Sequence, residues 1–150
     1  MPSSSNWLGM LQRIREHRRD TALQSLARSL QAATQIRDAT ASVEAMISSL
    51  SHTQKPTGRI ERLDSQRLRQ LRQDRDDLRS RRSDLRHQQV AAEAVVHQAQ
   101  ANAATKDNEV EVLRRLQDRL DFTHRQAQQR RDEQSPLDAA VSLCNGGRSG

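Results

Sequence analysis

The sequence has few of the residues that build a thick hydrophobic core. It contains one Trp, one Phe and no Tyr, and only 33% of its 150 residues are apolar. This apolar fraction is low for a globular domain. A seam between two helices needs only about two apolar residues in every seven. The composition therefore predicts a single domain, formed by helices in narrow contact.

Further shortages argue against chemical sites. The lone Cys144 cannot form an intrachain disulfide, which fits a reducing compartment. The glycines lie at Gly9, Gly58 and in the tail, and they form no phosphate-binding loop. The five histidines never fall three to five residues apart, so they do not suggest a metal site. We expect no catalytic residues, no metal, no cofactor and no enzyme activity.

Long apolar runs are also missing. The N-terminus lacks an apolar stretch of signal-peptide length, and nothing approaches the 18 or so apolar residues of a membrane span. We therefore expect a cytoplasmic protein that is not inserted into a membrane.

What is present is a long helical pattern without Gly or Pro between residues 60 and 134. Seven-residue steps connect one row of this segment, and a second row lies three to four residues from the first. Alternating steps of three and four place side chains in one stripe along a helix, as in a coiled coil. The first row contains Leu71, Leu78, Leu85, Ala92, Ala99, Lys106, Leu113 and Leu120.

A second helical pattern precedes it, over about residues 6–51, and includes Trp7, Leu11, Ile14, Leu23, Leu26, Leu30, Ala33, Ile36, Thr40, Val43, Ile47 and Leu50. Pro56 and Gly58 interrupt the helical pattern, which predicts a turn over residues 52–59. Ser135 and Pro136 predict a break, then a short terminal helix within 135–150 and a disordered tail. Because short breaks join antiparallel neighbours, we expect an all-α fold: a long antiparallel coiled-coil hairpin whose second helix is the longer.

Counting outward from this turn places residue i near residue 110 − i, so that Leu26 lies near Leu85. In this register, residues 106–134 extend beyond the first helix. The apolar residues of that overhang then lack a partner within the chain, which predicts a binding surface. Its members are Val110, Val112, Leu113, Leu116, Leu120 and Phe122.

The net charge is +6, and 23 of the 25 basic residues are Arg. Excess Arg can indicate phosphate binding, but acidic residues interrupt the Arg-rich segment 59–86 and would repel phosphate. Arg is also a good helix former that keeps an exposed helix soluble. We therefore expect no nucleic-acid partner, and keep an Arg-rich nucleic-acid-binding helix as the weakest alternative.

The C-terminal third contains a leucine-and-charge run over residues 112–119, followed by Glu133, Gln134, Leu137 and Asp138. In these residues the chain resembles the FliJ family of flagellar export proteins. A weaker match covers residues 67–73, although Arg75 stands where the family commonly has an aliphatic residue.

The resemblance implies a non-enzymatic coiled-coil stalk, similar to that of the ATP synthase γ subunit, in the flagellar (type III) protein export apparatus. Such a protein binds the hexameric export ATPase, promotes its assembly or activity, and contacts the export gate membrane protein and export chaperones. It would be associated peripherally with the inner face of the cell membrane. Partner-binding candidates are Leu113, Leu116 and Leu120 for the ATPase, and Leu68, Leu71 and Arg72 for the gate. Plain seam packing remains an alternative role for Leu68 and Leu71. A generic cytoplasmic coiled-coil adaptor or homodimer is the alternative function.

Overall fold

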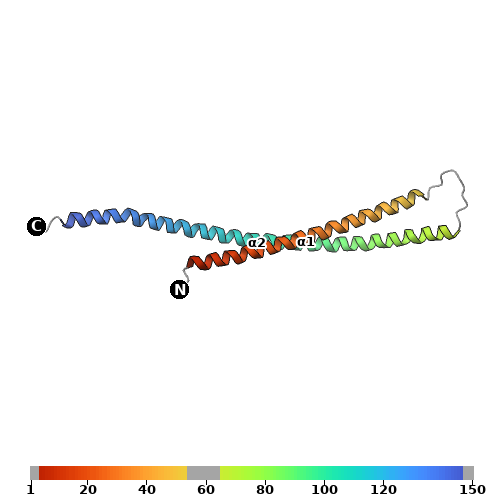
Figure 1. Ribbon diagram of the computed structural model, residues 1–150, viewed down its shortest axis with the longest axis horizontal. Coiled ribbons are helices and arrows are strands. Elements are labelled where there is room, and N and C mark those ends of the chain that lie inside the picture. The colour runs from red at the N-terminus through yellow and green to blue at the C-terminus, as the bar shows by residue number, and fades with distance from the viewer. Residues whose placement is uncertain (1–3, 54–64, 147–150) are drawn as a thin grey trace. The chain divides into compact units, whose positions relative to one another are not determined.

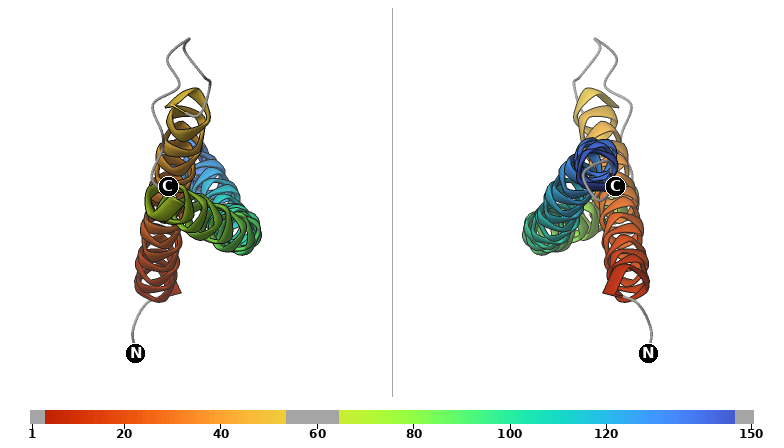
Figure 2. Two further views of the ribbon diagram at one scale, coloured as in Figure 1. Left: turned by 90° about the vertical axis from the view of Figure 1, so that its right-hand side faces the viewer. Right: turned by 90° about the vertical axis from the view of Figure 1, so that its left-hand side faces the viewer.

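The computed structural model describes residues 4–53 and 65–146, and all of them are helical. Helix α1 spans Ser4–Thr53 and helix α2 spans Ser65–Gly146. Figures 1 and 2 show these residues as coiled ribbons without a strand. The expected fold class is confirmed: the protein is an all-α, antiparallel helical hairpin whose second helix is the longer.

The chain divides into two compact units, each built from both helices. Residues 19–105 form one, which we call the middle unit. Residues 1–18 and 106–150 form the other, which we call the terminal unit.

In the middle unit, the buried side chains are small. Ala22, Ala33, Thr40, Val43 and Ala103 are its buried residues among those described. Thr40 satisfies its hydroxyl within α1 by donating a hydrogen bond of 2.8 Å to the carbonyl oxygen of Ile36. Small side chains let two helical backbones approach closely, so this seam is thin.

The inward-facing row of α2 largely follows the predicted pattern. Half-buried side chains recur along the helix at steps of three and four: Leu71, Arg75, Leu78, Arg82, Leu85, Gln89, Ala92, Val96 and Ala99. The corresponding prediction for α1 is wrong at two positions. Leu23 and Leu30 are exposed, while Ala22 is buried and Ser29 is half-buried in their place.

Ion pairs between α1 and α2 define the register of the middle unit. Arg37 pairs with Glu93 and Glu44 pairs with Arg86, each at 3.6 Å, and both pairs of residue numbers add to 130. Gln89 also donates a 3.0 Å hydrogen bond to Glu93. This hydrogen bond and the nearby Arg37 lower the pKa of the Glu93 carboxyl.

The predicted register, in which the numbers add to 110, is therefore wrong. It would have placed Glu44 opposite Gln66 and Arg37 opposite Gln73, where no ion pair can form. Opposite charges beside a coiled-coil seam select partners and alignment. These charges form ion pairs in the observed register and would have no opposite charge beside them in the predicted one.

The helix boundaries also differ from the predicted ones. His52 and Thr53, expected in the turn, belong to α1, while the rest of the predicted turn and residues 60–64 lie outside the described residues. At the other end, α2 continues through Pro136 to Gly146, without the expected break and separate terminal helix. An interior proline removes one hydrogen bond and its ring crowds the carbonyl of the residue four before it, at a cost of about 3 kcal/mol, but its φ suits a helix and the helix can continue past it. Residues 147–150 of the expected tail are outside the described residues.

Cross-linking distinguishes the two registers. In a Cys144→Ser background, Arg37→Cys with Glu93→Cys should be joined within one chain by a short bifunctional maleimide, because these positions face each other. The control pair, Arg37→Cys with Gln73→Cys, should not react in this way, since Gln73 lies about 30 Å along the helix from Glu93. Mass spectrometry of the digested monomer identifies the linked peptides. Efficient linking of the control pair alone would restore the predicted register.

Candidate functional site

The terminal unit contains the most deeply buried side chain of the described residues, Val110, which is 1% exposed. Its helices are joined by two ion pairs: Arg15 lies 3.2 Å from Glu109, and Glu16 lies 3.5 Å from Arg114. Leu8, Leu11 and Leu113 are half-buried. The first turns of α1 therefore cover α2 as far as about Gln117.

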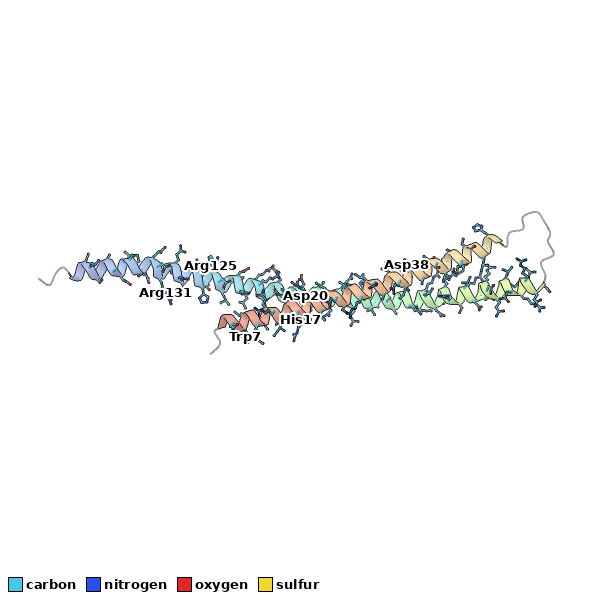
Figure 3. The ribbon with its side chains drawn as sticks, in the orientation of Figure 1. Trp7, His17, Asp20, Asp38, Arg125 and Arg131 are labelled. Carbon is cyan, nitrogen blue, oxygen red and sulfur yellow. The ribbon has the colours of Figure 1, made fainter. Side chains whose placement is uncertain are left out.

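The predicted overhang is correspondingly too long. It was expected to begin near Lys106 and to leave Val110 and Leu113 without a partner, but α1 covers both. Beyond Gln117, every described side chain of α2 as far as Leu143 is exposed. Figure 3 shows Arg125 and Arg131 on this part of α2, where no segment of α1 lies alongside.

The six predicted partner-binding residues are not gathered in one place. Leu113 is half-buried between the helices, whereas Leu116 and Leu120 are 45% and 37% exposed. Leu68 and Arg72 are exposed and Leu71 is half-buried, and these three lie in the middle unit. Leu116 and Leu120 are therefore the members of the predicted set that remain accessible in the terminal unit.

The structure adds residues of α1 that sequence reasoning had placed in the seam. Trp7 is 62% exposed and Ile14 is 42% exposed, so the expected seam roles of both residues are wrong. Figure 3 shows Trp7 on the first turns of α1. With Leu11 these residues are spaced by four and three, which places them along one side of the helix.

This side of α1 and the Leu116 side of α2 lie on the same flank of the terminal unit. Successive residues of a helix are turned by about 100°, so residues two apart point in roughly opposite directions. Ile14 precedes Glu16 by two and Leu116 follows Arg114 by two, and Glu16 and Arg114 form an ion pair on one flank. Ile14 and Leu116 therefore lie together on the other flank.

We call this surface the lateral apolar face. It consists of Trp7, Leu11, Ile14, Val112, Leu116 and Leu120. Two neighbouring helices that each present an apolar row on one flank form the groove into which a third amphipathic helix packs in a bundle. The arrangement is suited to binding a protein helix.

Other kinds of site find no support in the part of the chain that the structure describes. No group of three or more His, Cys, Asp or Glu side chains is arranged to hold a metal ion there. Neither described helix combines the length and the apolarity that crossing a membrane requires.

Comparisons of the chain with protein-family models, with curated proteins and with solved structures find no match. The resemblance to FliJ proteins accordingly depends only on the residues named for it above.

Substitution of two neighbouring valines tests how α1 covers α2. Val110→Asp should destabilise the protein by about 3 kcal/mol or more, because it places a carboxylate in the seam. Val112→Asp, two residues away and 65% exposed, should change stability by less than about 0.5 kcal/mol. Urea unfolding followed by circular dichroism measures both. Equal effects would show that the seam of the terminal unit does not run through Val110.

Proposed function

We propose that this chain is a non-catalytic coiled-coil component of a type III protein export apparatus. Its lateral apolar face binds the hexameric export ATPase and promotes ring assembly or ATPase activity. The observation that carries this proposal is the lateral apolar face itself. Leaving Trp7, Ile14, Val112 and Leu116 in water has a free-energy cost that a bound protein would remove.

The choice of an export ATPase as the partner rests on the lateral apolar face together with the sequence resemblance. Residues 112–119 supply both Val112 and Leu116 of the lateral apolar face, so the resembling segment and the exposed surface coincide. Glu133, Gln134, Leu137 and Asp138, which match the family ending, lie on the part of α2 that α1 leaves uncovered. A partner could therefore bind the lateral apolar face and also lie along the uncovered part of α2.

The remaining parts of the proposal concern the export gate and the chaperones. Leu68, Leu71 and Arg72 are the candidates for the gate membrane protein, and two of the three are exposed. Through these contacts the protein would be held at the inner face of the membrane without inserting into it. Chaperones would bind elsewhere on the exposed flanks of α1 or α2.

The test is a titration of the cognate export ATPase with this protein. The wild-type chain should raise the ATP hydrolysis rate and shift the ATPase from monomer to ring in sedimentation. Leu116→Asp with Leu120→Asp should abolish both effects and leave the helical circular dichroism signal nearly unchanged, because both side chains lie at the edge of the seam.

Val90→Asp with Val95→Asp is the matched control. These valines are also exposed residues of α2, but they lie in the middle unit, so the double variant should stimulate the ATPase as the wild type does. An unstimulated but active ATPase would refute the export assignment. If Leu116→Asp with Leu120→Asp instead converts a sedimenting dimer to a monomer, the lateral apolar face joins two copies of this chain.

A further inference from the structure

Five arginines of the middle unit form a continuous row on α2. Arg72, Arg75, Arg79, Arg82 and Arg86 follow one another at steps of three, four, three and four. This spacing keeps all five on one side of a helix. Arg72, Arg79 and Arg86 are exposed, and Arg75 and Arg82 are half-buried beside the seam. We call this row the arginine ladder.

The flank of α1 beside the ladder supplies only one carboxylate. Glu44 pairs with Arg86 at 3.6 Å. In the same register, Ser48 lies opposite Arg82 and Ser51 lies opposite Arg79. Ser51 directs its hydroxyl to its own helix, donating a 3.0 Å hydrogen bond to the carbonyl oxygen of Ile47. Within the described residues, Arg72, Arg79 and Arg82 form no ion pair.

Three of the four acidic residues in residues 65–86 of α2 lie elsewhere. Asp74 and Asp77 line an open groove with Met46, Ser49 and Leu50 of α1, on the other flank of the seam. Asp84 is seven residues from Asp77 and therefore shares its side of the helix. Asp76 is the acidic residue of this segment that shares the ladder's side, four residues from Arg72 and three from Arg79. That flank is therefore net positive, although eight Arg and four Asp lie along residues 65–86.

Such a row is unfavourable for the isolated protein. Like charges three or four residues apart destabilise a helix, and the ladder contains four such neighbouring pairs. The next ion pair along this flank, Arg37 with Glu93, shows the alternative of placing opposite charges across the seam. The missing carboxylates are most simply supplied by another molecule.

We propose that the arginine ladder is a docking surface for an acidic helix of another protein. A partner helix with Glu or Asp at steps of three and four would place carboxylates against Arg72, Arg79 and Arg82, and planar guanidinium groups bind carboxylates well. A helix is only about 10–12 Å wide and fits along a single row. This surface is separate from the lateral apolar face. It shares Arg72 with the candidate gate contact, but its test needs no component of the export apparatus.

A protein helix fits the surface better than a nucleic acid does. The exposed Asp76 lies beside the ladder, four residues from Arg72, and Glu44 lies across from Arg86. Every phosphate of a nucleic acid is negative and would be repelled by both carboxylates. A protein helix can instead place a neutral or basic side chain opposite each of them. Residues 65–86 also contain no aromatic side chain on which an unpaired base could stack.

Fluorescence anisotropy at low salt tests the inference on the full-length chain. The probe is a labelled helical peptide with Glu at ladder spacing, and a sequence with Gln in place of Glu is the control peptide. Arg72→Gln with Arg79→Gln should weaken binding of the Glu peptide by about tenfold, since two exposed charge contacts are lost. Arg67→Gln with Arg81→Gln removes the same charge from other sides of α2 and should weaken binding less than about twofold.

Both double variants should retain the helical circular dichroism signal, because the four arginines are exposed. Equal weakening by the two variants would overturn the proposal, since it would indicate attraction to the net charge alone. Tighter binding to a DNA duplex or to phosphatidylserine vesicles than to the Glu peptide, lost on Arg72→Gln with Arg79→Gln, would also overturn it. In that case the ladder binds phosphate groups.

Discussion

The whole structure depends on a seam that is only one side chain deep on each helix. Among the residues that the structure describes, the buried ones are small, chiefly alanine and valine, and no second layer of buried apolar residues lies behind them. Close approach of the two backbones must therefore supply the packing that a larger protein obtains from a thick core. A seam of this kind stabilises the hairpin, and it leaves both flanks of each helix in water. Any large apolar or like-charged row on those flanks then remains free to interact with another molecule.

The fold class could be predicted because a coiled-coil seam repeats every seven residues, and an apolar pattern that is weak in one heptad becomes clear over many. The inward row of α2 was found in this way, although it includes Arg75, Arg82 and Gln89. On α1 the same reasoning preferred Leu23 and Leu30 to their neighbours Ala22 and Ser29. Apolarity alone cannot identify the inward position when the helices approach so closely that small size is favoured. The helix break predicted at Pro136 was also wrong, because the loss of one hydrogen bond weakens a helix but does not always end it.

The register could not be predicted from the apolar pattern, because that pattern repeats every seven residues and fits several alignments of the two helices. The predicted and observed registers differ by 20 in the sum of paired residue numbers, which is close to three heptads. A shift by whole heptads brings seam positions back against seam positions, so both alignments bury similar side chains. The charges beside the seam are not periodic in this way. Glu16, Arg37, Glu44 and their partners on α2 distinguish the alignments, and pairing them first would have given the observed register.

The register also decides which residues can form a binding surface. Leu116 and Leu120 were selected because they were expected to lie beyond the end of α1. Leu116 instead lies beside α1 and is exposed because of its position on a flank, while Leu120 follows the last covered residue, Gln117. That change brings Trp7 and Ile14 beside them, which no argument from either helix alone could have shown. The arginine ladder follows the same logic, because its significance comes from Ser48 and Ser51 across the seam. In a protein built on one thin seam, each surface combines residues of both helices, and the register decides which residues lie side by side. Sequence reasoning finds such a surface only after the alignment is known.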